Sequence, residues 1–125
     1  MMLKRAPMAN VPTGLMTKCP RCGTLLITKE WLRDLKVCSR CGHHARYSAP
    51  ERVALLLDTG SWREWDAQLA PLDPLEFPSY IPKRTQAQEK TGLKDSCIIG
   101  EGTLAGRAVA LGATDFRFMG GSMGS

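Results

Sequence analysis

Two matched pairs of cysteines constrain the fold of this chain more than any other feature of its sequence. Each pair has two residues between its members, and fifteen residues separate the pairs: Cys19, Cys22, Cys38 and Cys41. This spacing is typical of a structural zinc site with four thiolate ligands. Gly23 and Gly42 directly follow the pairs, where a glycine lets the backbone turn sharply. We therefore predict a zinc ribbon over 18–46, with a hairpin-like excursion formed by 25–28 and 35–37.

The predicted zinc is structural, because four thiolates complete a tetrahedron and leave no position for water or substrate. His43 and His44 follow the last cysteine, but four thiolates suffice, so we expect both histidines to lie outside the ligand set. Cys97 stands in an apolar stretch far from the ribbon and is expected to be a buried free thiol. Two alternatives for the cysteine pairs are disulfides, which need an oxidising compartment, and a redox C-x-x-C, which needs one such motif beside a βαβ pattern.

The positive charge of the chain is concentrated in the predicted ribbon. The chain has a formal net charge of +5, and residues 18–46 hold seven basic side chains against two acidic ones. Four thiolates on a divalent ion lower the sum of this segment to about +3. A basic ribbon is also typical of nucleic-acid contact, so a zinc-ribbon nucleic-acid-binding module without enzymatic activity is one hypothesis. Trp31 and Tyr47 are the few aromatic side chains it would have for stacking on bases.

The composition is that of a globular protein of about one domain. The chain has 125 residues, of which 43% are hydrophobic and 23% charged. These values exclude a disordered tail and a fibrous repeat. No apolar run approaches the ~20 residues of a membrane span, and the N-terminus has no apolar core of a secretory signal. We therefore expect a cytoplasmic protein with no membrane partner.

Residues 47–95 are expected to form a helical and extended connecting segment. Ser48 and Glu51 make a capping box with Pro50 in the first turn, which predicts the start of a helix. Val53 begins the apolar face of this helix, and Gly60 is expected to end it as a C-cap glycine.

The S-x-x-E pattern repeats over 61–64 and predicts a second short helical turn. Four prolines then fall within 70–82, which excludes a regular helix or an inner strand and predicts an extended segment. Residues 83–91 have the polar pattern of a solvated helix, which Gly92 is expected to stop.

From residue 96 onward the pattern becomes β. Strands are predicted over 96–104 and 107–113, joined by a tight turn. Residues 114–118 are either a further strand or a continuation after a bend. The loop 119–125 contains three glycines, and such a loop allows a ligand to approach the backbone closely, although glycine loops are often only turns. A hairpin, one strand and a loop do not close a sheet, so we expect either that partners complete it or that this is the N-terminal piece of a longer protein.

Several segments in a fixed order carry a resemblance to one family. Besides the cysteine motifs these are APLDPLEFPSY, KTGLKD, GEGTLAGR and DFRFMGGSMGS. From Lys18 to Ser125 the chain resembles the N-terminal part of the β subunit of bacterial acetyl-coenzyme A carboxylase carboxyltransferase. Members of this family continue well past the glycine loop, so the chain is expected to be a truncated subunit.

The resemblance implies an α/β fold in which an N-terminal four-cysteine zinc ribbon is followed by the incomplete beginning of a crotonase-like domain over 96–125. Residues 1–17 are expected to be a flexible arm. The implied reaction moves a carboxyl group from carboxybiotin on a carrier protein to acetyl-CoA, which gives malonyl-CoA for fatty-acid biosynthesis. The implied partners are the carboxyltransferase α subunit, the biotin carboxyl carrier protein and biotin carboxylase, with biotin supplied by the carrier. No catalytic residue is carried over to this chain, and alone it is expected to be inactive.

The resemblance implies a substrate-binding role for Phe118 and for part of the glycine loop that follows it. The residues expected to line the acyl-CoA side of the site are Phe118, Gly120, Gly121, Ser122 and Met123. The glycines would permit close approach, and the methionine would supply a polarizable apolar wall. Two alternatives stay open: the loop only packs against a helix, or the ribbon itself meets CoA phosphates or the carrier protein through Arg33, Lys36 and Arg40.

Overall fold

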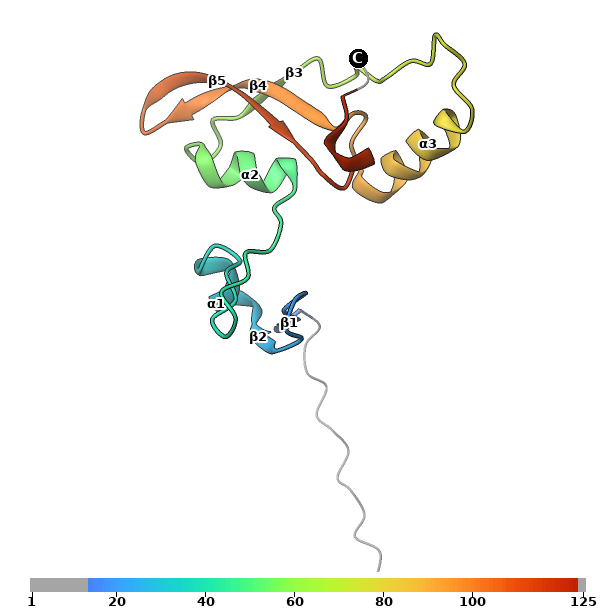
Figure 1. The fold of residues 1–125 in the computed structure, drawn as a ribbon. Coiled ribbons are helices and arrows are strands. Elements are labelled where there is room, and N and C mark those ends of the chain that lie inside the picture. The colour runs from blue at the N-terminus through green and yellow to red at the C-terminus, as the bar shows by residue number, and fades with distance from the viewer. Residues whose placement is uncertain (1–13, 124–125) are drawn as a thin grey trace, which may run out of the picture. The chain divides into compact units, whose positions relative to one another are not determined.

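The computed structural model describes residues 14–123, which fall into two compact units divided between Arg46 and Tyr47 (Figure 1). The first thirteen residues of the arm expected over 1–17 lie outside the described residues. Its last two belong to strand β1, which begins at Met16. No helix in the described part is long and apolar enough to cross a membrane.

Unit 1 is built from short elements around the four cysteines. Strand β1 (Met16–Lys18) pairs antiparallel with β2 (Leu25–Ile27), and helix α1 (Thr28–Arg33) follows directly. The predicted hairpin-like excursion is therefore wrong, because a helix occupies the segment between its two expected arms. The helix is followed by Leu35 and Lys36, both with positive φ, which turn the chain back toward the second cysteine pair.

Unit 2 contains a three-stranded antiparallel sheet in the order β3–β4–β5. Its strands are β3 (Arg63–Trp65), β4 (Cys97–Leu104) and β5 (Arg107–Thr114). Between β4 and β5, Ala105 and Gly106 both have positive φ, as a two-residue hairpin turn requires. The predicted hairpin is confirmed, with boundaries shifted by one residue. The mixed α/β class is confirmed as well.

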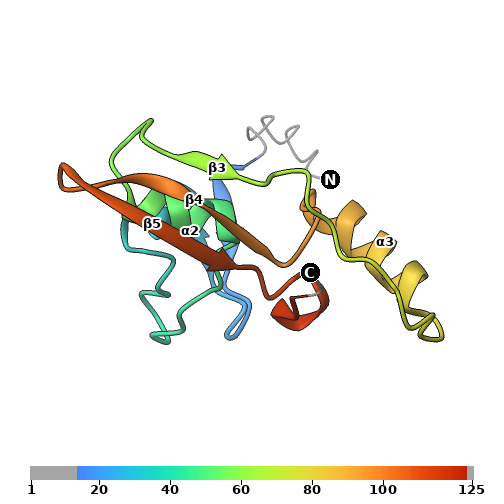
Figure 2. The same ribbon diagram turned by 90° about the horizontal axis from the view of Figure 1, so that it is seen from above.

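Helix α2 (Ala49–Leu56) covers one face of this sheet (Figures 1 and 2). The capping box is formed: the Ser48 hydroxyl accepts from the Glu51 N–H, and the Glu51 carboxylate accepts from the Ser48 N–H at 2.8 Å. The helix apposes its apolar face to β4 and β5. The buried core of unit 2 consists of Ala49, Val53, Leu57, Ile98 and Ala113.

The sequence predicted that helix α2 ends at Gly60, but the helix is shorter. It ends at Leu56, and Leu57 takes an extended conformation with its side chain in the core. The next residue, Asp58, accepts hydrogen bonds from the N–H groups of Ala105 and Gly106 at 3.0 and 2.9 Å. The hairpin turn, 47 residues away in the sequence, therefore ends the helix early by binding the segment that follows it.

The short helical turn predicted over 61–64 is wrong, because this segment enters strand β3. The Ser61 hydroxyl does not cap a helix; it donates to the Asp58 carbonyl at 2.8 Å and accepts from the Thr103 N–H at 3.0 Å. Gly100 makes the approach of β3 possible: a Cβ at this position would lie 2.3 Å from the carbonyl oxygen of Arg63.

Helix α3 (Tyr80–Thr91) starts three residues before the predicted start at Lys83. Pro82 is compatible with this start because the first turn of a helix needs no N–H donor from it. Gly92 ends the helix in the left-handed region with φ 74°, as predicted. The further strand considered over 114–118 is not formed, because strand β5 ends at Thr114. The chain turns there and forms the 3-10 turn η1 (Met119–Gly121), which contacts α3.

Candidate functional site

The four paired cysteines converge on one point in unit 1. Their sulfur atoms all lie within 4.8 Å of one another. Cys19 Sγ lies 3.8 Å from Cys41 Sγ, and Cys22 Sγ lies 3.7 Å from Cys38 Sγ. A tetrahedral zinc ion with Zn–S bonds of about 2.3 Å separates its sulfurs by about 3.8 Å. The four thiols are thus spaced as the ligands of one metal ion.

Two similar backbone knuckles hold these thiols in place. In the first, Gly23 N–H donates to the Cys19 carbonyl at 3.0 Å, and in the second Gly42 N–H donates to the Cys38 carbonyl at 2.9 Å. Both glycines have positive φ, 72° and 68°. The predicted reason for glycine after each pair is confirmed: each knuckle closes through a left-handed residue.

The structure supports neither disulfide bonds between the paired cysteines nor histidine ligands in their cluster. All five are free thiols, and the sulfur separations are far beyond the ~2.05 Å of a disulfide. The histidines contribute backbone atoms: the His43 carbonyl accepts from Cys38 N–H, and His44 forms a β-bridge with Val37. Neither histidine belongs to the metal-ligand cluster among the described residues.

The close packing of the thiols shifts their pKa values in different directions. The backbone at Cys22 is the largest influence lowering the pKa of Cys19. Hydrogen bonding to Thr24 lowers the pKa of Cys22 to about 6. The backbone of His43 lowers the pKa of Cys41, but burial and the neighbouring thiols outweigh it and raise that pKa to about 11. Four adjacent thiolates repel one another, and a divalent ion among them removes this cost.

Three basic side chains of the ribbon make contacts within unit 1. Lys36 is buried, 6% exposed, and its ammonium lies 5.7 Å from the centroid of the Trp31 ring. Arg33 pairs with Asp34 at 3.0 Å, and Arg40 donates to the Thr24 hydroxyl at 3.1 Å. Lys36 therefore does not offer its charge to a phosphate on the surface, as one interpretation of the sequence required.

The glycine loop of unit 2 is anchored at its start and exposed at its end. Phe118 is 1% exposed, whereas Met123 is 65% exposed. Gly120 and Gly121 have φ of 71° and 84°, and the Gly121 N–H donates to the Phe118 carbonyl at 2.8 Å. Of the predicted substrate-binding residues, Phe118 packs inside unit 2, and the others form the surface part of the loop.

Asp115, just before the loop, was not singled out from the sequence. Its carboxylate has no exposed surface. It accepts from the N–H of Ala49 at the start of α2 and from the backbone and guanidinium of Arg117. The Arg117 side chain is the main cause that lowers the pKa of Asp115 to about 2. An aspartate after a strand is too common a pattern to reveal this contact.

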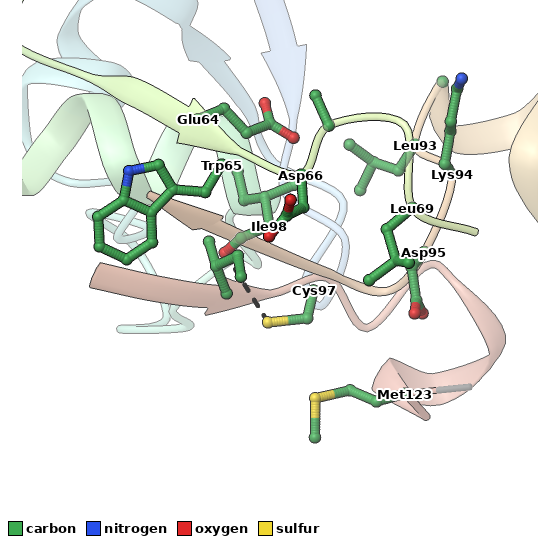
Figure 3. Close-up of a pocket in the computed structure, with 13 residues that line it drawn as sticks. Glu64, Trp65, Asp66, Leu69, Leu93, Lys94, Asp95, Cys97, Ile98 and Met123 are labelled. Atoms are coloured by element: carbon green, nitrogen blue, oxygen red, sulfur yellow. Dashed lines mark hydrogen bonds between the residues drawn. The ribbon is translucent and has the colours of Figure 1, made fainter. Parts of the chain in front are cut away.

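A pocket of about 340 Å³ adjoins the loop (Figure 3). Its lining comes from three separate segments, including Trp65 of β3, Cys97 and Ile99 of β4, and Met123 of the loop. In Figure 3, the Trp65 ring lies at the left and Met123 lies at the bottom, below Cys97. The sequence predicted that Cys97 is buried, but its side chain is only half-buried. Cys97 is the first residue of strand β4.

Known proteins resemble the chain over nearly its whole length, although no family model matches it. It is 49% identical to the acetyl-coenzyme A carboxylase carboxyl transferase subunit β of Synechococcus sp. (strain JA-2-3B'a(2-13)), over 98% of this chain and 40% of that protein. The subunit of Paenibacillus sp. (strain JDR-2) is 47% identical over 95% of this chain and 41% of that protein. The subunit of Gloeobacter violaceus is 50% identical over 93% of this chain and 39% of that protein.

One solved structure shows a weaker likeness: the transcarboxylase 12S crystal structure with methylmalonyl-coenzyme A and methylmalonic acid bound. It has a TM-score of 0.44 and 29% identity, over 62% of this chain and 13% of that chain. A likeness of this strength does not establish a shared fold. The sequence relatives are more informative, and the chain spans about two-fifths of their length. The resemblance seen in the sequence is thereby confirmed: this chain matches part of the carboxyl transferase β subunit of acetyl-coenzyme A carboxylase.

Proposed function

We propose that this chain supplies part of a biotin-dependent carboxyltransferase, which moves a carboxyl group from carboxybiotin to acetyl-CoA and forms malonyl-CoA for fatty-acid biosynthesis. One observation carries the proposal: identity of 46–50% to five carboxyl transferase β subunits over at least 93% of the chain. The matched length includes both units, so the similarity is not that of an isolated zinc ribbon.

The metal we assign to the four thiols is zinc. A set of four cysteine ligands in a tetrahedron is typical of structural zinc. Cys19 and Cys38 are each 2% exposed, whereas Cys22 is exposed, so two of the four ligands hold the site inside unit 1. The ion takes no part in chemistry in this proposal, because its ligand sphere is complete.

Residues 96–125 of unit 2 are proposed as the beginning of a crotonase-like domain that carries a substrate loop. Gly120, Gly121, Ser122 and Met123 form the surface that meets acyl-CoA, and the buried Phe118 fixes the start of this surface. The lining of the adjacent pocket includes several apolar side chains, which suits the thioester part of the substrate. The carboxyltransferase α subunit, the biotin carboxyl carrier protein that holds biotin, and biotin carboxylase are the proposed partners in the cytoplasm.

The nucleic-acid hypothesis has less support. Lys36 and Trp31 contact each other inside unit 1, which withdraws one cation and one of the few aromatic rings from a nucleic acid. Arg33 is likewise paired with Asp34.

A chimeric enzyme tests the proposed function. The chain replaces the matching segment of the Paenibacillus sp. (strain JDR-2) β subunit, and the chimera is combined with the α subunit of that organism. We expect carboxyl transfer between malonyl-CoA and biocytin by the chimera, and none by the 125-residue chain alone. A chimera that assembles with the α subunit but transfers no carboxyl group would overturn the proposal. Turnover by the isolated chain would overturn the view that it needs partners.

A further inference from the structure

The glycine loop contributes to two hollows of different chemistry. Met123, near its end, lines the pocket described above, where apolar side chains lie beside Glu64, Asp66 and Asp95. Met119, at its start, lines a second hollow of about 450 Å³ between the loop and α3. The other residues around this second hollow are Lys83, Gln86, Ala87, Lys90 and Arg117. We call the second hollow the basic groove.

The basic groove is built by one face of α3. Residues at positions i, i+3, i+4 and i+7 of a helix share a face, and Lys83, Gln86, Ala87 and Lys90 have this spacing. Ala87 is buried, 6% exposed, and α3 contacts η1. The small residue lets the loop approach the helix, and Lys83 and Lys90 line the groove beside it.

The charge of the groove is positive. No acidic side chain belongs to its lining, and Lys83 and Lys90 are both exposed. The Arg117 guanidinium is partly neutralised by Asp115, which it contacts through Nε at 2.9 Å and through its second terminal nitrogen at 2.7 Å. The two lysines therefore carry the attraction for an anion, and Gln86 adds an uncharged amide beside them.

The two hollows are close enough for one ligand. Met123 follows Met119 by four positions in the chain, and such a segment spans at most about 14 Å. A ligand with phosphates at one end and an apolar group at the other fits this arrangement. Its phosphates would lie by the lysines, and its apolar end by Met123.

We infer that the basic groove between α3 and η1 binds the phosphate groups of a coenzyme A thioester, whose thioester end enters the pocket at Met123. This inference rests on the proposed function, which supplies coenzyme A thioesters as the substrate class. It adds Lys83 and Lys90, on a helix that showed only a solvated polar pattern in the sequence, to the residues that recognise the substrate.

The test is calorimetric binding of coenzyme A, pantetheine and ATP to the zinc-loaded chimeric enzyme described above, which carries either the unaltered chain or its K83Q/K90Q variant. Pantetheine lacks the phosphates, and ATP lacks the thiol arm. We expect the double variant to bind coenzyme A about tenfold more weakly, because two exposed ion pairs each contribute modestly to affinity. Its affinity for pantetheine should not change. Coenzyme A should bind the unaltered chimera more tightly than ATP, and added salt should weaken this binding.

The matched control is K18Q/K29Q, which removes two exposed lysines outside both hollows and leaves the expected affinity unchanged. Equal binding of coenzyme A by the unaltered chimera and by K83Q/K90Q would overturn the inference while leaving the proposed function standing. Equal affinity for ATP and coenzyme A would overturn the assignment to a thioester. Binding of neither coenzyme A nor pantetheine would count against the inference and the proposed substrate loop together.

Discussion

Asp115 joins three parts of unit 2 through a single carboxylate. It accepts from the Ala49 N–H at 3.1 Å, which belongs to the first turn of α2, and from three nitrogens of Arg117. Its own N–H donates to the Ser96 carbonyl at 2.7 Å, just before β4. A negative charge at a helix N-terminus is favourable, so this residue ties α2 to the sheet and fixes the start of the glycine loop.

Replacement of this carboxylate is expected to destabilise unit 2. In the folded chain the pKa of Asp115 is lowered to about 2, mainly by Arg117. A depressed folded-state pKa stabilises the fold above the ordinary pKa, and this stability is lost as the pH falls through about 4 toward 2. We predict that Asp115→Asn lowers the free energy of unfolding at pH 7 by about 2 kcal/mol, a typical value for hydrogen bonds to a charged group.

Denaturant unfolding of unit 2 between pH 2 and pH 7 measures this effect. The stability difference between the chain and Asp115→Asn should shrink toward pH 2. Asp66→Asn, at an exposed aspartate outside the Asp115 network, is the control and should leave the profile unchanged. A constant difference across the whole pH range would contradict the role given to the charge.

At the metal centre the residue-scale prediction concerns Cys38, which is 2% exposed. Cys38→Ser removes one of four ligands, and in small modules of this kind metal binding supplies much of the folding free energy. We expect zinc below half an equivalent per chain and loss of ordered structure in unit 1, measured by elemental analysis and NMR. Cys97→Ser is the control, with zinc content unchanged. A full equivalent of zinc in Cys38→Ser would contradict the four-thiolate site.

At the scale of elements, the sequence correctly predicted those features that depend on contacts between neighbouring residues. The capping box at Ser48, the glycine stop of α3 at Gly92 and the turn at Ala105-Gly106 all depend on neighbours within a few residues. The two knuckles belong to the same class, because each closes within five residues.

Contacts between distant segments account for two of the errors. Strand β3 has three exposed residues and no apolar alternation, and it exists because it pairs with β4, as in the register Trp65 with Ile99. Helix α2 ends early because Asp58 binds the hairpin turn. The lining of the pocket and of the basic groove also joins distant segments, so no spacing in the sequence could reveal either.

The pairing of β3 with β4 gives a prediction with a matched control. Gly100→Ala places a methyl group against the Arg63 carbonyl, at 2.3 Å before relaxation, and should lower the stability of unit 2 by about 1–3 kcal/mol as β3 is displaced. Gly112→Ala, on the neighbouring strand, meets Ile99 only at an ordinary 3.6 Å and should change stability little. Thermal unfolding measures both variants, and equal melting temperatures would contradict the close packing of β3.

At the scale of the whole molecule, the two units contribute differently to the proposed enzyme. Unit 1 is organised by four thiols that converge on one metal site. Unit 2 has its own core of α2 against the sheet, and it presents the glycine loop between a basic groove and an apolar pocket. Since the chain spans about two-fifths of its relatives' length, the proposed reaction needs the rest of the subunit and its partners.

The measurement that tests the central claim most directly is the KM for the coenzyme A substrate of the chimeric enzyme carrying Gly121→Val. Gly121 has φ 84°, where a β-branched side chain is strained, so the loop is forced into another conformation. The account predicts a KM at least about tenfold higher, with zinc content and assembly with the α subunit unchanged. If assembly fails, the milder Ser122→Ala decides, since Ser122 has an ordinary extended backbone. An unaltered KM in the assembled Gly121→Val enzyme would contradict the assignment of this loop to acyl-CoA. If Gly121→Val does not assemble, an unaltered KM in Ser122→Ala would contradict it.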